Sequence, residues 1–177
     1  DEKQIFDALK IIKKGKASVI LLHCTSIYPT PDSLATLDRI TALKNKFGLD
    51  VGFSDHTNGW LAASIAVGKG ARVIEKHFTL NKKMKGPDHW FSLNPKEFRN
   101  YVNKIRIAEK MLGNNTLNPT DEELKNRHTM QVSMVFNQNL KKNTKIKLSF
   151  FDMLRSYKKS LTYADIKKVV GKKLKKK

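Results

Sequence analysis

The sequence has little cysteine and no long hydrophobic run. Cys24 is the only cysteine among the 177 residues, so no disulfide can form within the chain. Nothing therefore points to an oxidising compartment, and a cytoplasmic location is the default expectation. The longest apolar stretches, residues 17–22 and 61–67, are far too short to cross a bilayer, and no signal peptide is visible. We expect a protein that is not embedded in a membrane.

Acidic residues are also scarce. The chain holds 16 Asp and Glu against 35 Lys and Arg, which gives a formal net charge of +19. Such a balance can indicate nucleic acid or an anionic surface as a partner. Most of the cations are lysines, however, and they lack the alternation with aromatic residues that single-stranded nucleic-acid binders use. A solvated, lysine-rich surface is therefore favoured, and a basic module that binds nucleic acid or anionic surfaces is the alternative function.

The first two thirds of the chain alternate between helical and strand patterns. Apolar residues recur at helical spacing in four segments, and three short apolar runs between them are typical of buried strands. The predicted order is helix 4–12, strand 17–22, helix 34–47, strand 50–54, helix 60–67, strand 71–78 and helix 95–112. This alternation implies βαβ units and a parallel sheet, either in a closed barrel or in a doubly wound sheet.

The pattern changes in the last third of the chain. Residues 130–136 are predicted to be extended, residues 141–143 to form a turn and residues 164–170 to form a short helix. A separate small α+β domain is therefore expected. The predicted division is a first domain at 1–113, a linker at 114–125 and a second domain at 126–177.

Polar residues cluster where each predicted strand ends. In a β/α barrel the carboxyl ends of the strands converge on the active site. Leaving such side chains buried without partners costs free energy, so three clusters in succession are hard to explain by packing alone. The clusters are His23, Thr25, Ser26 and Tyr28, then Ser54, Asp55 and His56, and then Glu75, Lys76 and His77.

Two histidines stand out among these residues. His56 and His77 are 21 residues apart, which is the length of one βα unit, so their imidazoles could meet as ligands of a divalent metal. A lone histidine is more often a hydrogen-bonded core residue, but each of these follows an acidic residue closely, and the pair favours the metal hypothesis. The later loop Gly86-Pro87-Asp88-His89 either orients a substrate or is simply a turn.

Four ordered motifs together resemble the sialic acid synthase family. They are residues 23–29 (HCTSIYP), 52–57 (GFSDHT), 74–79 (IEKHFT) and 86–89 (GPDH) with Ser92 and Leu93. The resemblance implies that residues 1–113 are the later half of a TIM-type (β/α) barrel. It also implies, more weakly, that residues 126–177 are a truncated antifreeze-like (SAF) α+β domain.

The resemblance implies an enzyme that condenses phosphoenolpyruvate with an N-acetylated amino sugar. The nucleophilic carbon of phosphoenolpyruvate attacks the sugar aldehyde, water adds at the adjacent carbon, and phosphate leaves. The acceptor is N-acetylmannosamine or a diacetamido sugar leading to legionaminic or pseudaminic acid. The cofactor is a divalent metal, Mn²⁺ first, with Mg²⁺ or Co²⁺ as alternatives.

The resemblance also assigns roles to individual residues by motif position. His56 and His77 match metal ligands, Ser54 matches a phosphate contact, Ser26 lies near phosphoenolpyruvate, Tyr28 and Asp88 match sugar contacts, and Glu75 and Asp88 are the candidate catalytic residues. In the second domain, Arg155 falls where the family has an arginine that reaches the partner subunit's active site in a domain-swapped homodimer. The segment 156–159 replaces the turn expected after it.

A complete β/α barrel takes about 250 residues, and the motifs that carry the family's phosphoenolpyruvate-binding lysines have no counterparts here. We therefore expect this chain to be a fragment, or a split-gene product or remnant, with an unpaired edge on the strand at 17–22.

The first prediction concerns the chain alone. When phosphoenolpyruvate, Mn²⁺ and N-acetylmannosamine are added to the purified 177-residue chain, we expect no release of phosphate, because the segment that grips phosphoenolpyruvate is missing. A phosphate assay measures this directly, and clear turnover would contradict the expectation that the chain is incomplete.

Overall fold

The computed structural model describes residues 1–12, 14–155 and 161–175. The chain divides into two compact units, residues 1–114 and residues 115–177. Each unit has its own hydrophobic core and is described by itself.

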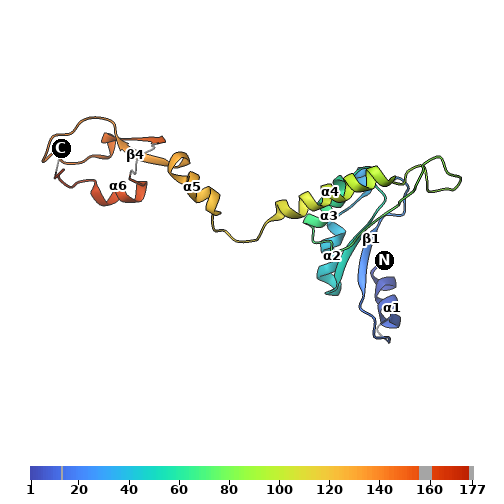
Figure 1. Cartoon of the computed structure of the whole chain (residues 1–177). Helices are drawn as coiled ribbons and strands as arrows, with labels where there is room; N and C mark the ends of the chain where they lie inside the picture. The colour runs from blue at the N-terminus through green and yellow to red at the C-terminus, as the bar shows by residue number, and fades with distance from the viewer. Residues whose placement is uncertain (13, 156–160, 176–177) are drawn as a thin grey trace. The chain divides into compact units, whose positions relative to one another are not determined.

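A parallel three-stranded sheet forms the centre of unit 1 (Figure 1). Its strands lie in the order β1-β2-β3 and are β1 (Ile20–Cys24), β2 (Asp50–Asp55) and β3 (Ile74–Lys76). In the register of the sheet, Cys24 lies beside Ser54, and Ser54 lies beside Glu75. The predicted mixed α/β unit with a parallel sheet is therefore confirmed at this level.

The helices of unit 1 begin and end at residues suited to those positions. They are α1 (Glu2–Ile12), the 3-10 helix η1 (Asp32–Leu34), α2 (Asp38–Phe47), α3 (Leu61–Gly68) and α4 (Pro95–Leu112). The side chain of Asn94 caps α4 in a reciprocal pair with Glu97, and Pro95 occupies the first turn. Helix α2 ends at Gly48, whose φ of 63° lies in the left-handed region that favours glycine.

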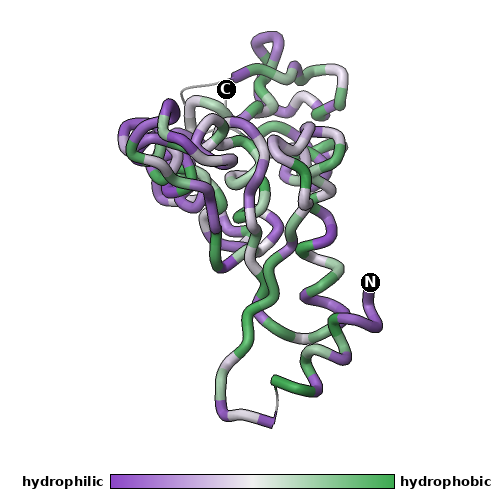
Figure 2. The backbone as a smooth tube through the Cα atoms, turned by 90° about the vertical axis from the view of Figure 1, so that its right-hand side faces the viewer, coloured by the Kyte–Doolittle hydropathy of each residue, from purple (hydrophilic) through white to green (hydrophobic). Residues whose placement is uncertain are grey.

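The core of unit 1 lies between the helices and one face of the sheet. Val51 and Phe53 of β2 point into it, because successive side chains of a strand point to opposite faces. Ile40 of α2 joins them, together with Ala62 and Ala66 of α3. Figure 2 shows that the turn after α1 is polar and that the segment between this turn and β1 is hydrophobic. Ile20 and Leu22 remain partly exposed on the other face of the sheet.

Some boundaries differ from the predicted ones. β1 begins three residues after the predicted start at Ala17, and β3 is much shorter than the predicted strand at 71–78. The residues before β3 still run along β2, since Arg72 donates its N–H to Val51 O at 2.8 Å and Val73 O accepts from Phe53 N–H at 2.8 Å. The predicted helix at 34–47 is divided, because η1 precedes α2 and Thr36 between them has a positive φ of 43°.

Unit 2 packs helix α6 against an antiparallel pair of strands. Its elements are α5 (Asp121–Met130), β4 (Val132–Phe136), η2 (Leu148–Phe150), β5 (Phe151–Arg155) and α6 (Tyr163–Val169). Met134, Ile146, Phe151 and Ile166 form its core. The last residues of the predicted linker at 114–125 are the first residues of α5, where Thr120 and Glu123 form a reciprocal cap. Among the described residues, no helix is long and apolar enough to span a membrane.

A glycine on β2 gives a test of how closely the strands pack. A Cβ added at Gly52 would lie 2.4 Å from Val73 O and 2.5 Å from Leu22 Cδ2. Since the backbone at Val73 would have to shift, Gly52→Ala should lower the free energy of unfolding by about 1–3 kcal/mol, measured by urea unfolding.

Gly68→Ala is the matched control for this substitution. A Cβ there meets only Leu112 Cδ2, at an ordinary 3.8 Å, at the end of α3. Stability should stay unchanged or rise by up to about 1 kcal/mol, because alanine favours helix. Equal effects of the two substitutions would show that the strand contact at Gly52 is not tight.

Candidate active site

Two imidazoles lie side by side where β2 and β3 end. The rings of His56 and His77 are 5.2 Å apart between centroids. Tyr28, in the loop after β1, packs on both of them, with its ring 4.2 Å from that of His56 and 5.6 Å from that of His77. Loops following three neighbouring strands therefore meet in one cluster at the carboxyl edge of the sheet.

One hydrogen bond fixes the tautomer of His56. Its Nδ1 lies 2.9 Å from the backbone oxygen of Thr25. A carbonyl oxygen only accepts hydrogen bonds, so Nδ1 must carry the hydrogen and donate it. In the neutral ring, Nε2 then presents a lone pair. Histidines that bind metals typically have this arrangement, with the second nitrogen donating to a carbonyl or carboxylate.

The neighbours of Nε2 do not satisfy this lone pair. Ser54 Oγ is the nearby polar atom, at 3.4 Å from His56 Nε2. Ser54 donates its single hydrogen to Glu75 Oε1, at 2.6 Å. Since a hydroxyl has one hydrogen to give, none remains for the imidazole. Nε2 of His56 is therefore suited to receive a proton or a cation.

The residues present are compatible with a metal ion bound by two imidazoles. His77 Nδ1 lies 3.9 Å from Asp88 Oδ2, so a carboxylate stands near the second ring as well. Within the part of the chain that the structure describes, no group of three or more His, Cys, Asp or Glu side chains is arranged to hold a metal. The two imidazoles that the described part of this site brings together are those of His56 and His77.

The loop before α4 completes the cluster. Phe91 packs against His77 and Tyr28 with centroid distances of 4.9 and 5.5 Å. His89 does not join the other two histidines, because its Nδ1 lies 2.8 Å from Thr79 Oγ1. Asp88 is more than half exposed at the open side of the cluster. Phe91 was missed by the sequence reasoning, since no local pattern connects it to residues 28 and 77.

Three residues of the predicted clusters face away from this site. His23 donates from Nε2 to the backbone oxygen of Ala35 at 2.8 Å, and its ring stacks on core residue Phe53. Asp55 and Lys76 lie between the site residues along β2 and β3, and they form a buried ion pair on the helix side of the sheet. The expectation that whole clusters would converge on one site was wrong, because strand side chains alternate between faces.

The buried ion pair involves α4 as well. Asp55 Oδ2 accepts from Tyr101 OH at 2.8 Å and lies 3.2 Å from Lys76 Nζ. Burial lowers the pKa of Lys76, and the neighbouring Asp55 carboxylate opposes this shift. Burial and the same carboxylate raise the pKa of the Tyr101 hydroxyl, so Tyr101 remains a hydrogen-bond donor.

Other predicted residues lie apart from the cluster. Ser26 is exposed in the loop between β1 and Tyr28, and no hydrogen bond joins it to His56 or Glu75 in the described ranges. Arg155 is exposed at the end of β5, in unit 2. The segment 156–159, predicted to replace a turn of the family, lies outside the described residues.

Comparison with known proteins identifies the family of this arrangement. A model of the NeuB family matches residues 1–116, which include the four motifs and every residue of the histidine cluster. The chain belongs to the NeuB family.

Individual relatives agree with this assignment. An N,N'-diacetyllegionaminic acid synthase of Legionella pneumophila is 40% identical over 88% of the chain, which corresponds to 44% of that protein. A pseudaminic acid synthase of Campylobacter jejuni is 45% identical over 71% of the chain and 37% of its own length. The crystal structure of an N-acetylneuraminic acid (sialic acid) synthetase from Leptospira borgpetersenii has a TM-score of 0.64 and 36% identity, over 73% of the chain and 47% of that protein. The chain thus spans less than half the length of these NeuB relatives.

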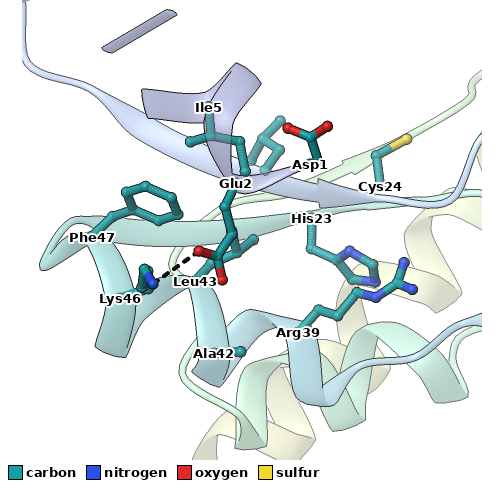
Figure 3. A pocket seen from close by; sticks show the side chains of 11 residues that line it. Asp1, Glu2, Ile5, His23, Cys24, Arg39, Ala42, Leu43, Lys46 and Phe47 are labelled. Atoms are coloured by element: carbon teal, nitrogen blue, oxygen red, sulfur yellow. Dashed lines mark ion pairs between the residues drawn. The ribbon is translucent and has the colours of Figure 1, made fainter. Parts of the chain in front are cut away.

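A cavity of about 590 Å³ lies beside the histidine cluster, between α1, β1 and α2. Figure 3 shows His23 and Arg39 side by side on one side of β1 and Cys24 on the other. Two of the residues that line the cavity, Glu2 and Lys46, form an ion pair with an N–O distance of 2.8 Å. Cys24 connects this cavity to the site, since its Sγ lies 3.8 Å from His56 Nδ1.

The hydrogen bond to Thr25 O predicts one tautomer in solution. In the metal-free chain, long-range ¹H–¹⁵N spectra of the neutral imidazole should show His56 protonated at Nδ1 and unprotonated at Nε2, because a backbone carbonyl can only accept. His89, whose Nδ1 faces the Thr79 hydroxyl rather than a backbone carbonyl, provides the internal comparison. An Nε2–H pattern for His56 would refute the assigned orientation of the ring.

Proposed function

We propose that residues 1–114 supply the metal-binding and sugar-binding half of an enzyme that condenses phosphoenolpyruvate with an N-acetylated amino sugar. The products are a nonulosonic acid and phosphate. The observation that carries the proposal is the pairing of the His56 and His77 imidazoles, with Tyr28 and Asp88 beside them, at one edge of the sheet. The NeuB relatives support it, since they are synthases of legionaminic, pseudaminic and N-acetylneuraminic acids.

His56 and His77 would hold the divalent metal, for which we propose Mn²⁺. A metal bound there supplies Lewis acidity toward the aldehyde oxygen of the sugar. In the neutral ring, Thr25 O holds the hydrogen on Nδ1, so Nε2 of His56 presents its lone pair to the metal. The ring of Tyr28 packs against the imidazole of His56, with 4.2 Å between the ring centroids. The side chain of Asp88 is exposed enough to hydrogen-bond a sugar hydroxyl.

Ser54 and Glu75 form a second functional pair in this proposal. Ser54 would contact the phosphate of phosphoenolpyruvate, but its hydrogen is directed to Glu75 at 2.6 Å. Donation to a phosphate oxygen therefore requires the hydroxyl to turn away from Glu75. That rotation leaves the Glu75 carboxylate without its donor, at a place where it can accept a proton from water or from the sugar.

The rest of the protein is proposed from the family. Unit 1 would be the later half of a TIM-type barrel, and residues 126–177 an incomplete antifreeze-like (SAF) domain. In a domain-swapped homodimer, Arg155 would contribute to the partner subunit's site. Among the described residues β1 pairs only with β2, and its apolar side chains Ile20 and Leu22 are partly exposed, which is consistent with further barrel strands beside it.

A chimera tests the proposed reaction. The part of the Legionella pneumophila synthase that precedes its match to this chain is joined to residues 1–177. With Mn²⁺ and phosphoenolpyruvate, we expect phosphate release that depends on the sugar. N-acetylmannosamine and the two diacetamido sugars are compared, and the largest kcat/KM identifies the acceptor.

Paired substitutions in the chimera test the metal ligands. His56→Ala with His77→Ala should lower kcat/KM at least about 100-fold, because the Lewis acid is lost. Arg106→Ala, at an exposed ion pair on α4, is the control and should retain activity. Metal-independent activity in the double variant, or no activity with any of the three sugars, would contradict the proposal.

A further inference from the structure

A buried ion pair lies directly behind the histidine cluster, on the opposite face of the sheet. Asp55 of β2 and Lys76 of β3 are neighbours in the register of the two strands. Their side chains are 0% and 4% exposed, and Lys76 Nζ lies 3.2 Å from Asp55 Oδ2. None of the proposed catalytic steps uses either group.

The pair is saturated with hydrogen bonds. Asp55 Oδ1 accepts from both the N–H and the hydroxyl of Thr57, at 2.8 and 2.7 Å, while Oδ2 accepts from Tyr101 OH. Lys76 donates a further hydrogen bond to Thr57 O and lies over the ring of Tyr101. One carboxylate thus joins β2, β3, the loop after β2 and helix α4.

The positions of these residues along the strands relate the pair to the site. Asp55 stands between Ser54 and His56, and Lys76 stands between Glu75 and His77. Side chains of a strand alternate between faces, so each charged residue is flanked by two site residues that point the other way. Slippage of β3 by one residue would turn its site residues to the opposite face. Holding Asp55 opposite Lys76 therefore holds Ser54 opposite Glu75 and keeps the two imidazoles adjacent.

The pair also fixes the backbone that follows His56. Thr57 is bound through its N–H, hydroxyl and carbonyl oxygen to the two charged groups. The carbonyl of His56 accepts from Thr30 N–H at 2.8 Å, which joins the loop bearing Tyr28 to the same stretch of backbone. Thr57 follows His56 directly in the chain. A change at the pair would therefore reach the His56 ring, and the loop that carries Tyr28, through Thr57.

We infer that the Asp55–Lys76 pair, with Tyr101, is a positioning device that sets the separation and orientation of the His56 and His77 imidazoles. Stability alone does not account for such a pair, because replacing a buried ion pair by neutral side chains of similar shape often leaves stability unchanged or raises it. Asp55, Lys76 and Tyr101 are positioning residues, since they act through the histidines. The inference rests on the proposed function only where metal binding is the readout.

The test uses the full 177-residue chain and separates position from stability. In Asp55→Asn with Lys76→Met, both charges are removed and no unpaired charge is left buried. Tyr101→Phe removes one hydrogen bond, and Lys76→Arg keeps the charge. The control is Lys82→Met, which breaks an exposed ion pair between the loop after β3 and Glu97 of α4.

Two quantities are measured on variants that retain the wild-type circular dichroism spectrum. The first is the pair of Cε1–Hε1 resonances of His56 and His77 without metal, which should move in the double variant. The second is the affinity for Co²⁺, followed by visible absorption, which should fall about 10- to 100-fold, as it does when groups that orient metal ligands are lost. Tyr101→Phe should give a smaller change in the same direction, Lys76→Arg should restore much of the wild-type behaviour, and Lys82→Met should match the wild type.

The outcomes separate this inference from the proposed metal site. If the wild-type chain binds no Co²⁺, the proposed metal site fails, and the imidazole resonances alone decide the inference. A folded double variant with wild-type resonances overturns the positioning role. Resonances that shift equally in the double variant and in Lys82→Met would also overturn it. If the double variant does not fold, Tyr101→Phe decides, and unchanged resonances in that variant overturn the inference.

Discussion

The alternation of side chains along β2 and β3 is the constraint on which the rest of unit 1 depends. Each strand presents its odd and even residues to different surroundings. On β2, Val51 and Phe53 enter the core and Asp55 continues the same row, whereas Ser54 belongs to the row that leads to His56. Core packing, the buried ion pair and the histidine cluster are thus three consequences of one two-residue period. A substitution that shifts the side chains of one row also shifts those of the other, because both rows belong to the same strands and share the same pairing of β2 with β3.

Replacing only one of the two residues of the buried ion pair is expected to lower the stability of the fold. Removing Lys76 alone would leave the Asp55 carboxylate uncompensated in the interior, a loss of about 3–5 kcal/mol in comparable cases. The network limits this cost by giving the carboxylate three further donors, which are the N–H and the hydroxyl of Thr57 and the hydroxyl of Tyr101. The side chains of Asp55 and Lys76 are themselves 0% and 4% exposed.

The sequence predicted the helices and the order of elements in unit 1 well, because the apolar spacing and the signals at Asn94 and Gly48 are local. Strand limits were less accurate, since hydrogen bonding to a neighbouring strand decides them. Helix α5 was missed although Thr120 and Glu123 form a recognisable capping pair. The histidines could be found from their spacing, whereas the partnership of Asp55 with Tyr101 joins residues 46 positions apart and leaves no local signal.

The reciprocal caps of α4, α5 and α6 have a consequence for the order of folding events. Each cap joins residues three positions apart, so these helices can start from their own sequence before any sheet exists. Helix α4, with 18 residues, gains most from an early start. The bond from Tyr101 to Asp55 closes a much longer loop and is expected to form late. Assembly of the buried pair would then be among the last steps of folding, and the histidines would take their places only once the unit is otherwise complete.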